Sequence, residues 1–77
     1  MTRKPMTGRS DMELVVNGKS MRCAKGMTLL GLLGELGLAP EAIVVERNAE
    51  FVQRSQYGDT ALSDGDTLEL IQFVGGG

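Results

Sequence analysis

The sequence has no histidine, no tryptophan and a single cysteine, Cys23, among its 77 residues. One cysteine cannot form an internal disulfide. Without histidine the chain lacks the most common general base and the most common zinc ligand, so a Ser-His-Asp site and a histidine-bound metal are excluded. The remaining residue types offer no set of acid, base and nucleophile, and an independent enzyme is therefore the least favoured class.

Long apolar segments are also absent. There is no run of roughly 18 apolar residues and no apolar N-terminal segment, which predicts neither a membrane span nor secretion. We therefore expect a cytoplasmic protein that acts away from membranes. Hydrophobic residues make up 42% of the chain, enough for one compact domain.

Charge is distributed unevenly along the chain. Residues 1–11 carry three basic residues against one acidic, whereas residues 12–77 carry five basic against nine acidic. The acidic body argues against nucleic acid and favours a partner with a basic docking surface, although solubility alone is an equal explanation. The first segment has no apolar period, and we expect a flexible extension over residues 1–11 before a domain over residues 12–74. The sequence leaves open whether this extension is native.

The dipeptide Asn17-Gly18 predicts a β-hairpin, because it supplies the two positive-φ positions of a type I′ turn. A two-residue loop fixes the register of the flanking strands and gives one apolar face. Cys23 falls on that face, which favours a core cysteine over a reactive thiol. The predicted pairs are Val16 with Lys19, Leu14 with Met21 and Met12 with Cys23 on the apolar face, and Val15 with Ser20 and Glu13 with Arg22 on the other.

A helix is predicted from Leu29 to about Leu36, where four leucines share one helical stripe. Thr28 is a suitable N-cap, and Gly37 suits the position just after the helix. Two further glycines, Gly31 and Gly34, lie inside the helix and should each cost about 1 kcal/mol relative to alanine. They reflect either sequence drift or the close approach of a neighbouring element.

The remaining elements complete a mixed fold. Strands are predicted over residues 42–47 and 67–74, with a short return strand from residue 51 and one helical turn over residues 55–57. The order strand, strand, helix, strand, short strand, strand predicts an α+β fold of the ubiquitin-like β-grasp type. Its mixed sheet would have four to five strands, with the main helix on one face and the last strand beside the first.

The chain ends in Gly75-Gly76-Gly77, directly after the last predicted strand. Residues 75–77 should form a thin, flexible tail that can enter a narrow channel in another protein. The terminal carboxylate, with a pKa of about 3.5, is ionised at neutral pH and is a poor electrophile. Adenylation by ATP followed by attack of a sulfur donor would leave a thiocarboxylate at Gly77. Taken alone, three terminal glycines are more often a frayed terminus or residues left by cloning. The compact fold that ends immediately before them is what favours a functional tail.

Several segments, in order and spacing, resemble the ThiS family, the sulfur carriers of thiamine biosynthesis. The resemblance implies that Gly77 is adenylated and thiocarboxylated, and that the protein is a carrier with no bound cofactor. Phe73, Val74, Gly75 and Gly76 would then be the partner-binding tail. The matching segments are Val16–Lys19, Cys23–Leu29, Val45–Asn48, Asp64–Asp66 and Ile71–Gly77.

The same resemblance implies the partners. They are a ubiquitin-activating-type adenylyltransferase, which uses ATP, a sulfur-donor protein, and thiazole synthase as the receiver of sulfur; the free carrier would be a monomer. Two residues depart from the family pattern: Ala49 stands where glycine is common, and Gln53 where proline is common. Both differences affect turns far from the tail, so they concern the local backbone conformation there more than the function.

Ile71 and Phe73 share the strand face opposite the predicted helix, and we expect an apolar docking patch there. The alternative is that both are ordinary sheet residues partly shielded by loops. Other functions also stay open. The same chemistry would serve molybdopterin synthesis, cysteine synthesis or tRNA thiolation, and a β-grasp domain can also be a protein-conjugating modifier or an interaction module that is never activated.

Overall fold

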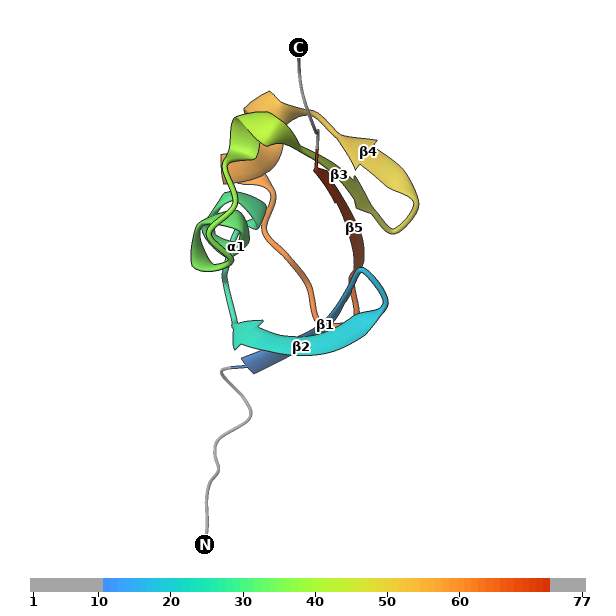
Figure 1. The fold of residues 1–77 in the computed structure, drawn as a ribbon. Helices are drawn as coiled ribbons and strands as arrows, with labels where there is room; N and C mark the ends of the chain where they lie inside the picture. Colours follow the sequence, from blue (N-terminus) through green and yellow to red (C-terminus); the bar gives the residue numbers. More distant parts are fainter. Residues whose placement is uncertain (1–10, 73–77) are drawn as a thin grey trace, which may run out of the picture.

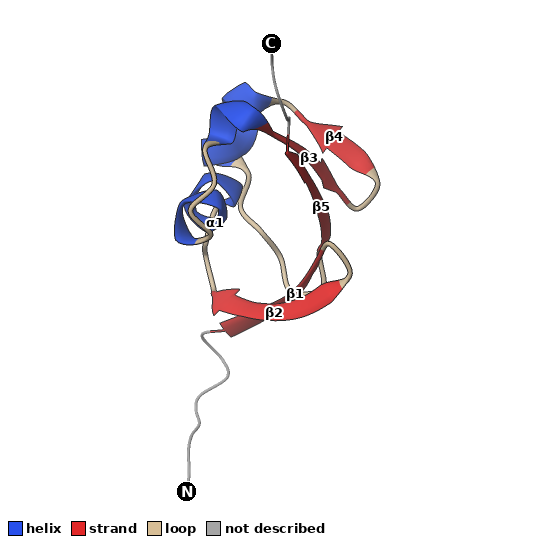
Figure 2. Ribbon diagram, in the orientation of Figure 1, coloured by secondary structure: helices blue, strands red, loops and turns tan. Residues whose placement is uncertain are grey.

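The computed structural model describes residues 11–72 of the chain. Five strands form one mixed sheet in the order β2-β1-β5-β3-β4, and the helical elements all lie on one side of it (Figures 1 and 2). This arrangement confirms the predicted β-grasp fold. The elements are β1 (Asp11–Val16), β2 (Lys19–Ala24), α1 (Leu29–Glu35), η2 (Pro40–Ala42), β3 (Ile43–Arg47), β4 (Glu50–Val52), η3 (Arg54–Asp59) and β5 (Thr67–Gln72), where η denotes a 3₁₀ helix.

The first hairpin has the predicted register at every position. Asn17 and Gly18 have φ values of 51° and 84°, as a type I′ turn requires. Strand β1 begins one residue earlier than expected. Asp11 pairs with Ala24, and its carboxylate lies 3.8 Å from the Arg22 guanidinium. Asp11 therefore belongs to the domain and not to the extension.

Helix α1 has the predicted caps at both ends. The Thr28 hydroxyl accepts a hydrogen bond from the Gly31 N–H at 3.1 Å. Gly37 has a φ of 74°, its N–H donates to the Gly34 carbonyl, and the next N–H donates to the Leu33 carbonyl. This pair of bonds is a Schellman motif, which only a residue tolerant of positive φ completes without strain. The helix ends at Glu35, one residue before the expected end.

The second hairpin joins β3 to β4 through Asn48 and Ala49, with φ values of 52° and 72°. Alanine in this region costs roughly 1–2 kcal/mol, so the departure from glycine adds strain without changing the turn. Gln53 has a φ of −71°, close to the value that proline would fix. Residue 42, predicted to begin β3, lies in η2 instead, because its N–H bonds back to the Ala39 carbonyl.

The core fills the space between the sheet and the helical side. Tyr57, on η3, contributes to it: its ring is buried and its hydroxyl donates to the Ile43 carbonyl at 2.7 Å. The predicted helical turn at residues 55–57 is thus part of a longer element that closes the core. The core residues are Met12, Leu14, Val16, Leu29, Leu32, Leu33, Ile43, Val45, Tyr57, Leu62 and Leu68.

One carboxylate, Asp66, is buried just before β5 and holds three segments together. Its oxygens accept hydrogen bonds from Arg47 Nε at 2.9 Å, Asn48 Nδ2 at 3.0 Å and the Ser63 N–H at 2.8 Å. Burial by itself raises the pKa of Asp66, but these hydrogen bonds and the arginine charge outweigh it and lower the pKa below its usual value. The sequence predicted only a turn at this point.

Gly34 offers a test of the glycines within α1. An added Cβ at Gly34 would meet no atom within 4 Å, so close packing does not explain this glycine. Gly34→Ala should raise the free energy of unfolding by about 0.5–1 kcal/mol. The matched change Gly37→Ala should lower it, because the φ of 74° strains alanine. Urea denaturation of the two variants checks both signs; a destabilised Gly34→Ala would contradict the packing seen here.

The buried carboxylate predicts a pH-dependent contribution to stability. In Asp66→Asn, the side-chain N–H₂ would face one of the donors that now bond to the carboxylate. The free energy of unfolding should therefore fall by about 1–3 kcal/mol at neutral pH. The pKa of Asp66 is lower in the folded state than in the unfolded chain. The stability that its carboxylate adds is therefore complete above the unfolded-state pKa of about 3.9, and it is lost as pH falls through the folded-state pKa. Denaturation at neutral and acid pH measures this. The exposed change Asp59→Asn is the control, and an equal deficit for Asp66→Asn at both pH values would contradict the prediction.

Candidate functional site

The candidate site is the end of β5, from which the glycine tail follows. Gln72 is the last described residue, and the predicted tail residues, Phe73 to Gly77, lie outside the described part of the chain. Strand β5 is held by β3 as far as Gln72, which pairs with Ile43. On its other side it runs parallel to β1, but that pairing ends at Val16 and Leu68. The last half of β5 thus has a strand on one side only.

The side chain of Asn17 occupies the position where β1 would have continued. The Leu70 N–H donates to Asn17 Oδ1 at 2.8 Å, and Asn17 Nδ2 donates to the Leu70 carbonyl at 3.4 Å. The backbone N–H of Asn17 also donates to the Leu68 carbonyl at 2.9 Å. One turn residue therefore extends the support of β5 by two residues toward the tail.

The sheet face opposite the helix carries exposed apolar side chains close to this end. Ile71 is 46% exposed and pairs with the half-buried Val44 on β3. Phe51, on β4, is 69% exposed and shares this face. We call Val44, Phe51 and Ile71 the outer patch. The helices of the described residues all lie on the other side of the sheet (Figure 2). Ile71 keeps 46% of its surface exposed, and Phe73, its expected companion in the patch, lies outside the described residues.

Two carboxylates adjoin the outer patch. Glu46 on β3 is the direct partner of both Phe51 and Glu69 in the sheet register. Like charges on directly opposed residues repel each other. Among the described residues, no basic side chain forms an ion pair with either glutamate. A cationic group placed beside them would relieve this repulsion. The apolar outer patch thus has two carboxylates beside it, in keeping with the preference for a basic partner surface expected from the sequence.

Cys23 and the potential metal ligands are the other polar groups to consider within residues 11–72. Burial, followed by the charges of Glu35 and Asp11, raises the pKa of the Cys23 thiol, which disfavours a thiolate nucleophile. Cys23 is half-buried and packs against the core, as the register predicted. Within residues 11–72, no three potential ligands lie close enough to hold a metal, and no helix is long and apolar enough to cross a membrane.

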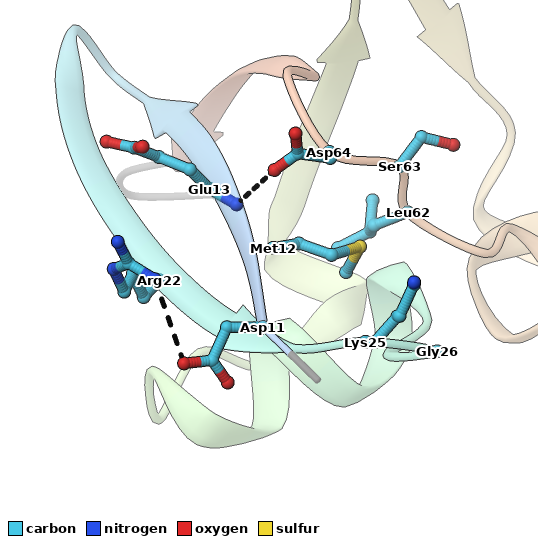
Figure 3. A pocket seen from close by; sticks show the side chains of 9 residues that line it. All are labelled: Asp11, Met12, Glu13, Arg22, Lys25, Gly26, Leu62, Ser63 and Asp64. Carbon is cyan, nitrogen blue, oxygen red and sulfur yellow. Dashed lines mark hydrogen bonds and ion pairs between the residues drawn. The ribbon is translucent and has the colours of Figure 1, made fainter. Parts of the chain in front are cut away.

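An open pocket of about 640 Å³ lies between the β1–β2 hairpin and the loop at residues 62–64 (Figure 3). Its lining includes Asp64, whose carboxylate accepts from the Glu13 N–H at 2.7 Å, and the Asp11–Arg22 ion pair. Because β1 and β5 are parallel, the start of β1 and the end of β5 lie at opposite ends of the sheet (Figure 1). This pocket is therefore far from the tail.

Sequence reasoning identified Ile71 but missed Phe51 and the second role of Asn17. Asn17 was recognised only as a turn residue, because its contact with Leu70 joins residues 53 positions apart. Phe51 was assigned to a short strand, and its face depends on the pairing of β4 with β3. The sequence did hold a signal that could have pointed to Phe51. It is one of two phenylalanines in the chain, and it stands in a strand of three residues.

Comparison with known proteins gives consistent matches. Residues 14–77 match the ThiS family. A thiazole synthase of Paramagnetospirillum magneticum is 47% identical over 66 residues, which are 86% of this chain but only 20% of that protein. The sulfur carrier protein ThiS of Bacillus subtilis is 37% identical over 65 residues, covering 83% of this chain and 98% of that protein.

A solved structure agrees with these matches. The crystal structure of the thiamine biosynthesis protein ThiS from Geobacter metallireducens has a TM-score of 0.74 at 38% identity, and the match covers 86% of this chain and 100% of that chain. Residues 14–77, which match the ThiS family, include the hairpin turn, the outer patch and the glycine end. On these grounds the chain belongs to the ThiS family of ubiquitin-like β-grasp proteins.

Proposed function

We propose that this chain is a sulfur carrier that accepts sulfur at the carboxylate of Gly77 and delivers it for thiazole formation in thiamine biosynthesis. The observation that carries the proposal is the family match, which extends through residue 77 and so includes the whole glycine end. The fold supports it, because the tail follows a strand in the interior of the sheet. The protein itself supplies no catalytic group, and its role is to be recognised and charged by others.

The chemistry requires two steps at one carbon atom. A Gly77 carboxylate oxygen attacks the α-phosphorus of ATP, the bond to pyrophosphate breaks, and an acyl-adenylate forms. A hydrosulfide ion, or its equivalent from a donor protein, then attacks the carbonyl carbon, and AMP leaves with the bonding electron pair. The thioacid loses its proton and remains as a thiocarboxylate. Residues without side chains beside this carbon let an enzyme's backbone approach closely.

The proposed partners are an adenylyltransferase, a sulfur-donor protein and thiazole synthase. The link to thiazole synthase is supported by a protein of that name that contains a region similar to most of this chain. For the adenylyltransferase we propose a surface that covers the outer patch, with an apolar centre that receives Phe51 and Ile71. A basic side chain of the enzyme would lie beside Glu46 and Glu69, and Phe73 would extend the contact toward the tail.

Charging of the terminus is the direct test of the proposed function. The full chain, incubated with ATP, a cognate ThiS-type adenylyltransferase and sulfide, should gain the mass difference between one sulfur and one oxygen atom. A variant without Gly76 and Gly77 keeps every described contact of the domain and should gain nothing. Intact-mass spectrometry measures the mass of both proteins before and after the reaction.

Three other outcomes would contradict the proposal. An unchanged mass with an enzyme that charges its own carrier would indicate an interaction module. An isopeptide bond from Gly77 to lysine would indicate a protein modifier. A charged chain that transfers sulfur to a molybdopterin-synthase large subunit, but not to thiazole synthase, would place the carrier in the other pathway.

The outer patch gives a separate prediction for activation. Phe51→Ala and Ile71→Ala should each raise the KM for the carrier about tenfold, because each change removes a side chain that is buried against the enzyme in the proposed complex. Their exposure means that the free energy of unfolding should change little. Leu30→Ala is the matched control: Leu30 is 43% exposed but lies on the helical side. Pyrophosphate exchange measures the KM, and an equal effect of all three changes would argue against the patch.

A further inference from the structure

We propose that Asn17 is a positioning residue for the carrier tail, which it directs by holding the last part of β5. The inference rests on the proposed function, because it concerns how the tail is presented for charging. It assigns to a turn residue a task that is separate from making the turn.

The argument begins with the unequal lengths of the parallel strands. The pairing of β1 with β5 stops at Val16 and Leu68, whereas β5 continues to Gln72. Without a further partner, the Leu70 N–H and carbonyl would face the empty side of the strand. Asn17 fills this position with an acceptor at 2.8 Å and a donor at 3.4 Å. Its amide thus imitates the donor and acceptor of one more strand residue.

The residue type is restricted from two directions. Asn17 has a φ of 51°, which glycine, asparagine and aspartate adopt most readily. The contact to Leu70 requires an acceptor and a donor on a short side chain, and asparagine is the one member of this group that has both. Glycine would satisfy the turn and lose the contact. Aspartate would satisfy the turn and keep the acceptor.

The effect on the tail follows from the geometry of the strand end. Beyond Leu70, β3 is the one described strand that pairs with β5, through Ile71 and Gln72. With Asn17 in place, β5 is held on both sides until two residues before the last described position. Without it, this terminal part would be held on one side only, and an enzyme would have to order it on binding. Ordering backbone is costly, and this cost appears as weaker binding of the carrier.

A second turn asparagine provides a matched control. Asn48 has nearly the same φ, 52°, and its side chain also bonds to β5, accepting from the Thr67 N–H at 2.9 Å. It differs in place: Thr67 begins β5, whereas Leu70 lies near its end. Asn48→Gly therefore removes a comparable side-chain contact, and the bond to Asp66 with it, far from the tail.

The test compares Asn17→Gly, Asn17→Asp and Asn48→Gly with the wild-type chain. Pyrophosphate exchange with a ThiS-type adenylyltransferase gives kcat and KM for each carrier, and amide hydrogen exchange reports protection of Leu70. Asn17→Gly should raise the KM roughly fivefold to tenfold with kcat nearly unchanged, because the cost is one of ordering about one residue on binding. It should also expose the Leu70 amide. Asn48→Gly should lower stability at least as much and leave the KM near the wild-type value.

Asn17→Asp should have a KM between those of the wild type and Asn17→Gly, since its carboxylate keeps the bond from the Leu70 N–H. Equal KM values for Asn17→Gly and Asn48→Gly would overturn the positioning role, as would a normal KM for Asn17→Gly with an unprotected Leu70. A wild-type chain that supports no exchange at all would instead overturn the proposed function, and the positioning role with it.

Discussion

The placement of β5 between β1 and β3 is the constraint on which the other features of this protein depend. It joins the last described segment of the chain to the first, through N–H donors of Val15 and Asn17 to carbonyls of Asp66 and Leu68, each at 2.9 Å. Leu68 is fully buried at this junction. Since β5 is the strand that joins the β1–β2 hairpin to the β3–β4 hairpin, the sheet is complete only when both ends of the domain have met. The strand that carries the tail is thus among the best-supported parts of the fold.

Side chains of two turn residues fix β5 in addition to its neighbouring strands. Asn48, which also bonds to the buried Asp66, holds the beginning of the strand, and Asn17 holds it near the end. These contacts join segments distant in sequence, and all of them come from asparagines in hairpin turns, where the positive φ already favours glycine, asparagine or aspartate. A residue required for local geometry is used a second time for tertiary geometry. Such double use explains how so short a chain positions one strand firmly.

The two faces of the sheet have different tasks. The inner face and the helical elements bury the core, including Tyr57, and the described residues contain no group of three potential metal ligands. The outer face keeps Phe51 and Ile71 exposed beside Glu46 and Glu69. Exposed apolar groups around opposed carboxylates are unfavourable for a free domain, and both costs disappear when a partner with apolar and basic groups covers them. This property suits the proposed role, in which other proteins would charge the carrier.

The sequence by itself determined the features that depend on neighbouring residues. The type I′ turn at Asn17-Gly18, the register of the first hairpin, the Thr28 cap and the end of the helix at Gly37 all follow from local sterics and hydrogen bonding, and the order of elements was enough for the fold class. Two observed element ends differ from the predicted ones by one residue: β1 begins at Asp11 and α1 ends at Glu35. Differences of this size are expected, because pairing and fraying decide the last residue of an element.

Only the tertiary structure decided which distant groups meet. The sequence could not show that the Asn17 amide reaches Leu70, that Asp66 is buried against Arg47, or that Phe51 shares a face with Ile71, because each depends on the strand order β2-β1-β5-β3-β4. Local preferences set the conformation of each segment, whereas these contacts arise from non-local pairing that burial of the whole core selects. The glycine tail was recognisable from the sequence, but the place of β5 within the sheet and its contact with Asn17 became visible only once the sheet was assembled.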